Sequence, residues 1–149
     1  MAVRRVFVER RQGFDAVAAR LLDDIRGFLQ VPSVSAVRRF YRFDVEGFGE
    51  ADFARAVCHV LSDPPIDATF DALPLPEGPH RLLAVESLPG QYDERADLTA
   101  QCLQLMAPGE RPAVACADVY LFEGALSEAE FSRIRAHLIN PVECREAAA

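Results

Sequence analysis

Residues 82–97 have the sequence Leu82-Leu83-Ala84-Val85-Glu86-Ser87-Leu88-Pro89-Gly90-Gln91-Tyr92-Asp93-Glu94-Arg95-Ala96-Asp97. The apolar residues 82–86 predict a strand, Pro89-Gly90 predicts a turn, and the spacing of apolar residues over 97–106 predicts a helix. The charged residues after the turn can form a solvated first helical turn, because acidic side chains there complement the helix dipole. They can also form a recognition loop, because loops between rigid elements commonly carry binding groups.

The same succession of signals occurs once earlier in the chain. Phe7-Val8-Glu9 precedes a turn and Asp15, as Ala84-Val85-Glu86 precedes a turn and Asp93. Further on, Glu46-Gly47 corresponds to Glu123-Gly124, and residues 50–53 (Glu-Ala-Asp-Phe) correspond to residues 128–131 (Glu-Ala-Glu-Phe). The offset between the two sets is 77 or 78 residues, which indicates an internal repeat.

Each half of this repeat predicts strands alternating with helices. The predicted strands are 4–11, 37–46, 66–70, 82–86, 114–123 and 142–146, and the predicted helices follow Asp15, Gly49, Asp97 and Ser127. In the helix over 97–106, Leu98, Cys102, Leu105 and Met106 are expected to form the buried stripe. Ser127 and Glu130 have the spacing of a capping box.

These patterns predict an α+β protein with two ferredoxin-like βαβα(β) halves, residues 1–72 and 81–149. Residues 73–80, which are rich in proline, are the expected linker. A half of about 70 residues is too small to bury a generous core alone. We therefore expect the halves either to extend or to face one another's sheets, as a pseudo-dimeric α/β sandwich within one domain.

Composition excludes several classes of function. A net charge of −7 and a pI of about 4.9 argue against binding to nucleic acid. The apolar runs are shorter than the ~20 residues that span a bilayer, and the N-terminus lacks the apolar core of a signal peptide, so a cytoplasmic protein without membrane contact is expected. The four cysteines have no C-x-x-C spacing, and we expect them to be buried small hydrophobes rather than metal ligands.

The residues also lack a recognisable catalytic centre. The sequence has no glycine-rich phosphate loop, no G-x-S-x-G and no H-E-x-x-H. His59 and His137 fall at equivalent repeat positions, which favours a packing or interface role, although the sequence alone leaves a further role open. Taken by themselves, the residues predict an interaction or ligand-positioning module.

Several stretches resemble one known family. Residues 84–86 and 88–97, followed by Ala100-Gln101-Cys102, are similar to the N-terminal domain of phosphoribosylformylglycinamidine synthase (FGAM synthase, or FGAR amidotransferase), in the single-chain form found in clostridia. Weaker supporting matches occur in the same order: Val6-Phe7-Val8-Glu9, Phe43-Asp44-Val45-Glu46-Gly47, Ser62-Asp63-Pro64-Pro65, Gly109-Glu110-Arg111-Pro112 and Leu138-Ile139-Asn140-Pro141-Val142. The resemblance extends from about Val3 to the C-terminus.

This resemblance implies a role in purine biosynthesis. In the family, the N-terminal domain is like a fused dimer of a small separate subunit, and the whole ligase uses ATP, Mg²⁺ and glutamine. The implied partners are the synthetase core and the glutaminase, which lie outside residues 1–149. No cofactor is expected to bind this chain, no catalytic residue is assigned to it, and none of its cysteines is expected to be the glutaminase nucleophile.

The implied task is to dock on the synthetase core, help close the FGAR site and couple it to ammonia derived from glutamine. The expected docking or substrate-site residues are Pro89, Gly90, Gln91, Tyr92, Asp93, Glu94, Arg95 and Asp97. Arg95 is suited to a phosphate or carboxylate, whereas Asp97 can serve either the site or the helix start. The alternative function is a stand-alone ferredoxin-like interaction or small-ligand module. A homodimer of the isolated chain is also possible.

Overall fold

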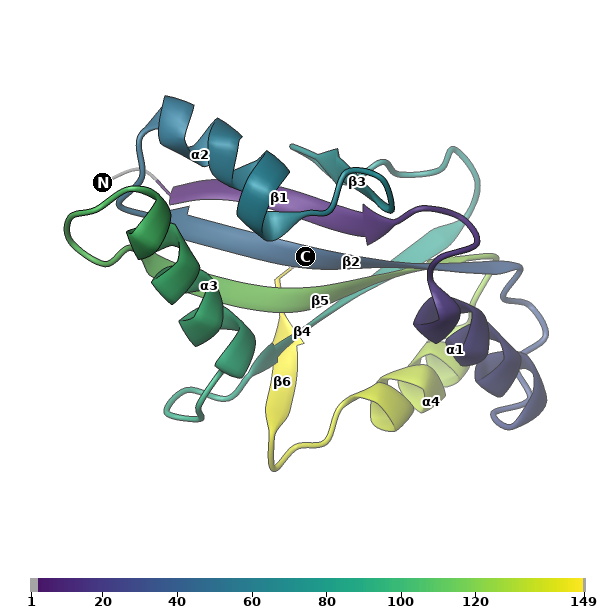
Figure 1. Ribbon diagram of the computed structural model, residues 1–149. Helices are drawn as coiled ribbons and strands as arrows, with labels where there is room; N and C mark the ends of the chain where they lie inside the picture. The colour runs from purple at the N-terminus through teal and green to yellow at the C-terminus, as the bar shows by residue number, and fades with distance from the viewer. Residues whose placement is uncertain (1–2, 149) are drawn as a thin grey trace.

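Strands and helices mostly alternate along the chain in the computed structural model, which describes residues 3–148 (Figure 1). The strands are β1 (Val3–Arg10), β2 (Ala36–Glu46), β3 (Asp67–Phe70), β4 (His80–Ser87), β5 (Ala113–Glu123) and β6 (Cys144–Ala147). The helices are α1 (Ala16–Gly27), α2 (Glu50–Ala56), α3 (Glu94–Met106) and α4 (Glu128–Leu138), and α2 continues into a π-helical turn, η1 (Val57–Leu61). The predicted α+β class is confirmed.

The strands of residues 3–148 form a single antiparallel sheet in the order β3-β1-β2-β5-β4-β6. The longest strands, β2 and β5, pair at its centre, from Ala36 opposite Glu123 to Glu46 opposite Ala113. At the midpoint of this ladder Tyr41 lies opposite Asp118. The two parts of the chain therefore extend each other's sheet.

One face of the sheet is covered by the helices (Figure 1). Beneath α1 and α4, the core contains Ile25, Leu83, Phe122 and Ile134, among others. Beneath α2, η1 and α3, the buried residues include Val6, Val8, Phe43, Val45, Leu61 and Leu103. Side chains of β2 alternate between the two faces, as expected for a strand, so Tyr41, Phe43 and Val45 lie on the helical side.

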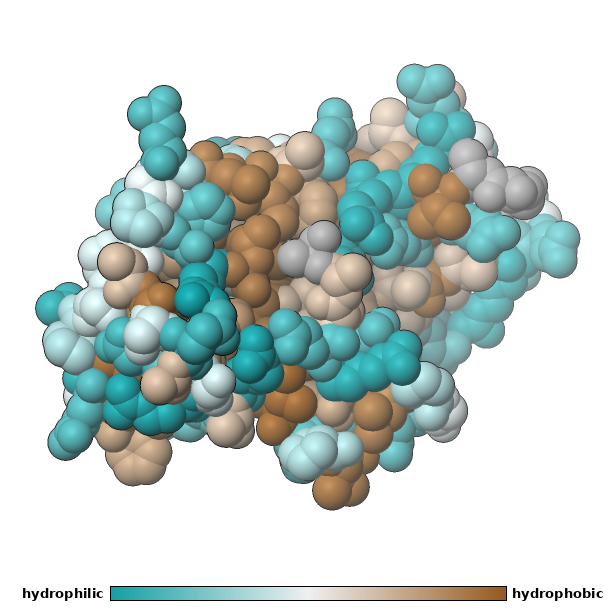
Figure 2. All heavy atoms as spheres, turned by 180° about the vertical axis from the view of Figure 1, so that it is seen from behind, coloured by the Kyte–Doolittle hydropathy of each residue, from teal (hydrophilic) through white to brown (hydrophobic). Residues whose placement is uncertain are grey.

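The opposite face carries no helix within residues 3–148, and we call it the open face. Its apolar cluster contains Phe7, Phe40, Ala84, Val119 and Leu121, against which Leu73 and Ala147 pack. Figure 2, which views the molecule from behind, shows apolar atoms in a band bordered by hydrophilic groups. Two arginines hold chain segments over this face, because Arg38 donates to the carbonyl of Pro74 and Arg42 to that of Ala148.

The helix starts follow from local chemistry. Asp15 and Asp93 are the N-caps of α1 and α3, and their carboxylates accept from the amides of Ala18 and Ala96 at 3.0 and 3.1 Å. The predicted capping box of α4 is confirmed, since Ser127 and Glu130 each accept the other's backbone N–H. Because Asp93 is the cap, α3 begins three residues before the predicted start at Asp97.

Two expectations about burial were wrong. In the predicted stripe of α3, Leu98 and Leu105 are 51% and 83% exposed and Cys102 is exposed, whereas Ala100 and Leu103 are buried. Only Met106 of that stripe packs against the core. At 100° per residue, the apolar residues of this helix spread over more than half of its circumference, so their spacing did not identify the buried side. Cys58 is exposed as well, and Cys116 and Cys144 are only half-buried, so the cysteines are not all core residues.

Candidate functional site

The predicted docking loop begins as an exposed turn. The N–H of Gln91 donates to the carbonyl of Leu88 at 3.0 Å, and Gly90 has a φ of +84°, which suits glycine best. Pro89, Gly90 and Gln91 are exposed, and Tyr92 is 73% exposed. This part of the loop is therefore available to a partner.

The remaining predicted residues belong to the start of α3. Asp93 is the N-cap, and Glu94 and Asp97 lie in the first helical turn, where negative charge complements the helix dipole. Glu94 is exposed to solvent. The three acidic residues therefore stabilise the start of α3, and this role is compatible with a further role in binding.

Arg95 connects the start of α3 to the centre of the sheet. Its Nη2 lies 3.2 Å from Oδ1 of Asp118 on β5, and its guanidinium lies over the Tyr41 ring of β2, 4.2 Å from the centroid. The side chain is 38% exposed. Arg95 therefore makes contacts within this chain, and its exposed part can still meet a ligand or a partner.

Arg39 approaches the same tyrosine from β2. Its Nη1 donates to the Tyr41 hydroxyl at 3.0 Å, and its Nη2 lies 3.5 Å from the carboxylate of Asp15, the cap of α1. Arg39 and Arg95 thereby link the starts of α1 and α3 to the central strands. Arg39, Tyr41 and Asp118 are not among the site residues that the sequence predicts. The arginine and aromatic residues gathered at positions 38–43 were the available signal for Arg39 and Tyr41.

Asp97 is the centre of a hydrogen-bonded cluster at the surface. Its carboxylate accepts from the Tyr92 hydroxyl at 2.7 Å, from Gln101 at 3.0 Å and from the guanidinium of Arg111. The Tyr92 hydrogen bond is the largest cause that lowers the pKa of Asp97 below its ordinary value of 3.8, and Arg111 and Gln101 lower it further. Asp97 is consequently ionised at neutral pH and holds Tyr92 against α3.

A small cavity lies beside Arg95. It has a volume of about 190 Å³, and its lining includes Arg95, Asp118, Cys116, Tyr120 and Leu138. Burial raises the pKa of the Cys116 thiol to about 12 and that of the Tyr120 phenol to about 12. Both groups therefore stay protonated at neutral pH, so Cys116 is not an activated nucleophile.

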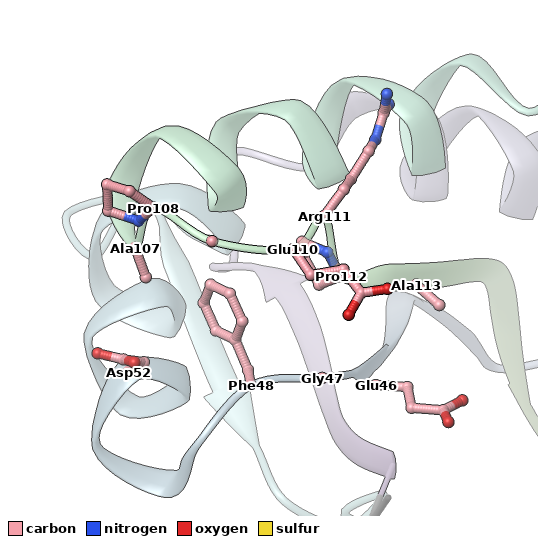
Figure 3. A pocket seen from close by; sticks show the side chains of 11 residues that line it. Glu46, Gly47, Phe48, Asp52, Ala107, Pro108, Glu110, Arg111, Pro112 and Ala113 are labelled. Carbon is pink, nitrogen blue, oxygen red and sulfur yellow. The ribbon is translucent and has the colours of Figure 1, made fainter.

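A larger pocket of about 400 Å³ lies between the loop after α3 and the start of α2 (Figure 3). The Phe48 ring points toward the loop of Ala107, Pro108 and Glu110, while Arg111 extends away from it toward α3. The carboxylates of Glu46, Asp52 and Glu110 give the lining an acidic character. This region includes Gly109-Glu110-Arg111-Pro112, one of the stretches that carry the family resemblance.

Within residues 3–148, no three His, Cys, Asp or Glu side chains gather in a way that could hold a metal ion. His59 and His137 are both exposed, and the His137 ring lies 6.2 Å from that of Phe28. Over the same residues, no helix combines the length and apolar character that crossing a bilayer requires.

Comparison with known proteins gave no family assignment. No protein-family model matches the chain, and no curated protein matches it.

Proposed function

We propose that this chain is the non-catalytic N-terminal domain of FGAM synthase and that it acts in purine biosynthesis by docking on the ATP-dependent synthetase core. The observation that carries the proposal is the similarity of residues 88–97 and Ala100-Gln101-Cys102 to that domain. This segment forms one continuous unit, an exposed turn followed by the first turns of α3. Such a unit suits recognition, because a rigid helix holds the loop in a defined position.

We further propose that the chain is an internal duplication of two ferredoxin-like halves. The strand order supports this, since β3-β1-β2 is followed by β5-β4-β6, which is the arrangement that a two-fold axis through the sheet centre produces. The register supports it as well. With the repeat offset of 77 residues, Tyr41 corresponds to Asp118, and these two residues face each other at the midpoint of the β2–β5 ladder.

In this function the chain itself forms and breaks no covalent bond. The chemistry of ATP, Mg²⁺ and glutamine belongs to the synthetase and glutaminase, and this chain positions groups at the edge of the FGAR site and supports coupling to ammonia release. The contacts of Arg95 with Asp118 and Tyr41 support a positioning role, because they tie the loop to the most extensively paired strands of the sheet.

The test compares Arg95→Ala with Arg55→Ala in the complete enzyme. Arg55 lies on α2 and forms only an exposed ion pair with Asp52, so it controls for the loss of a surface charge. We expect Arg95→Ala to lower glutamine-dependent turnover about tenfold or more, because small displacements near a substrate site can cost ~100-fold. Arg55→Ala should retain normal turnover. Normal kinetics of the Arg95→Ala variant would show that Arg95 does not belong to the site.

The 149-residue chain alone is expected to show neither glutaminase nor ATPase activity. The reading frame beyond Ala149 separates this proposal from the stand-alone module. Continuation into a large ATP-dependent synthetase supports the proposal, whereas a stop codon with no synthetase gene nearby favours a stand-alone interaction or small-ligand module.

A further inference from the structure

The outer side of α3 presents an apolar stripe to solvent. We define the α3 stripe as Leu98, Cys102 and Leu105, of which Leu98 is 51% and Leu105 is 83% exposed. At 100° per residue, these three positions fall within an arc of about 60° on one side of the helix. Tyr92, 73% exposed, stands just before the helix and is held by its hydrogen bond to Asp97. Contiguous exposed apolar side chains of this kind mark interaction surfaces.

The surroundings of the stripe are acidic. Glu94 lies one helical turn before Leu98 on the same side of α3, and Glu110 is exposed in the loop beyond Leu105. The acidic pocket of Glu46, Asp52 and Glu110 adjoins the end of the helix at Ala107 and Pro108 (Figure 3).

The arginines next to the stripe do not offset this charge. Arg95 is directed inward to Asp118 and Tyr41, and Arg111 pairs with Asp97. The stripe therefore offers apolar contact within a negative border.

We propose that the α3 stripe is the docking surface for the synthetase core, through an apolar patch on that partner bordered by basic side chains. This inference rests on the proposed function and names the surface by which it is carried out. The acidic border fits a partner with basic side chains and disfavours a second copy of the chain. Two copies that met through their stripes would bring Glu94 and Glu110 of both together in a chain of net charge −7, and like charges at an interface disfavour association.

The natural cysteines provide a footprint of this surface. Cys102 belongs to the stripe. Cys58 on η1 is also exposed and lies outside the stripe, so its thiol serves as the control. The reagent is N-ethylmaleimide, and its rate of reaction at each thiol is followed by mass spectrometry of the peptides. In the complete enzyme, or in the complex of this chain with its synthetase, Cys102 should react about tenfold or more slowly than in the isolated chain. Cys58 should react at the same rate in both.

The possible outcomes separate the two proposals. If the chain forms no complex with the synthetase and is not continuous with it, both the proposed function and the docking surface fail. If the complex is active but Cys102 reacts as fast as in the isolated chain, only the docking surface fails. Concentration-dependent protection of Cys102 in the isolated chain, together with a dimer in light scattering, would assign the stripe to a second copy and overturn the inference.

A substitution tests the same surface by affinity. Leu105→Glu places a charge in the stripe, and Phe28→Glu makes the same change at a residue on the C-terminal side of α1 that is 78% exposed. We expect Leu105→Glu to weaken binding to the synthetase about tenfold or more and Phe28→Glu to leave it unchanged, with both variants unfolding at the wild-type temperature. Equal affinities of the two variants would contradict the proposed surface.

Discussion

Tyr41 and Asp118 lie opposite each other at the midpoint of the β2–β5 ladder, and the guanidinium of Arg95 contacts both of them. Three elements meet at this point: β2, β5 and the first turn of α3. The position of the loop at residues 88–97 thus depends on the pairing of the two central strands. Any displacement of α3 relative to the sheet would disturb a cation–π contact and an ion pair together.

Removal of the Arg95 side chain should destabilise the isolated chain modestly. Because Arg95 and Asp118 are 38% and 28% exposed, solvent screens the pair. We expect Arg95→Ala to lower the free energy of unfolding by about 1 kcal/mol, most of it from the contact with Tyr41. Arg55→Ala, which removes an exposed pair on α2, should change it by less than about 0.5 kcal/mol. Urea unfolding of both variants measures the difference, and equal stabilities would contradict a linking role for Arg95.

Leu103 and Leu105 should respond oppositely to truncation. Leu103 is fully buried against α2 and β2 residues, so Leu103→Ala should cost about 2–5 kcal/mol through the cavity it leaves. Leu105 is 83% exposed, so Leu105→Ala should change stability by less than about 0.5 kcal/mol. Thermal or chemical unfolding of the two variants checks the orientation of α3. A larger loss of stability for Leu105→Ala than for Leu103→Ala would show that Leu105, rather than Leu103, is the buried residue.

Gly124 should tolerate no side chain. Its φ is +134°, and a Cβ at this position would lie 2.0 Å from the carbonyl oxygen of Ser33. Gly124→Ala should therefore destabilise the protein by about 3 kcal/mol or more, from backbone strain and overpacking combined. The control is Gly78→Ala, where nothing lies within 4 Å of the added Cβ, and a change below about 1 kcal/mol is expected. Calorimetry of both variants distinguishes them.

The ionisation of Asp97 should depend on Tyr92. The folded pKa of Asp97 is below its ordinary value of 3.8, and the Tyr92 hydrogen bond is the largest cause. Because the folded pKa is depressed, the stabilisation by this carboxylate is present above the unfolded pKa and is lost as the pH falls through the folded pKa.

Carboxyl NMR titration should show the pKa of Asp97 rising toward 3.8 in Tyr92→Phe. The rise should be smaller in Gln101→Leu, since the Gln101 hydrogen bond is a lesser cause of the shift. An unchanged pKa in Tyr92→Phe would show that the hydroxyl does not contact Asp97 in solution.

The elements themselves could be predicted because their signals are local. Asp15 and the Ser127–Glu130 pair mark helix starts through hydrogen bonds to backbone groups a few residues away. Alternating apolar residues predicted β2 for the same reason, since the two-residue period of a strand depends only on neighbouring residues. The start of α3 was missed by three residues because two acidic residues, Asp93 and Asp97, are each suitable near a helix N-terminus.

The buried side of α3 could not be predicted in the same way. Leu98, Leu103 and Leu105 are chemically equivalent, and each belongs to an acceptable apolar stripe. In the structure Ala100 and Leu103 are buried on the same side of α3, and Leu103 packs in a cluster with Val45, Phe48 and Ala56. The partners of Arg95 could not be predicted either, since Tyr41 lies on the distant strand β2 and Asp118 on β5, 23 residues from Arg95.

The sequence by itself determined the α+β class, the order of strands and helices, the helix caps, and the segment of residues 88–97 that suggests a function. Only the tertiary structure decided that the sheet is continuous through β2 and β5, that Arg95 is directed to its centre, and that Leu98, Cys102 and Leu105 face solvent. The physical reason is the distance along the sequence over which each kind of interaction acts. Turns, caps and periodicity arise from residues within a few positions of one another, whereas burial and ion pairing depend on which distant segments pack together.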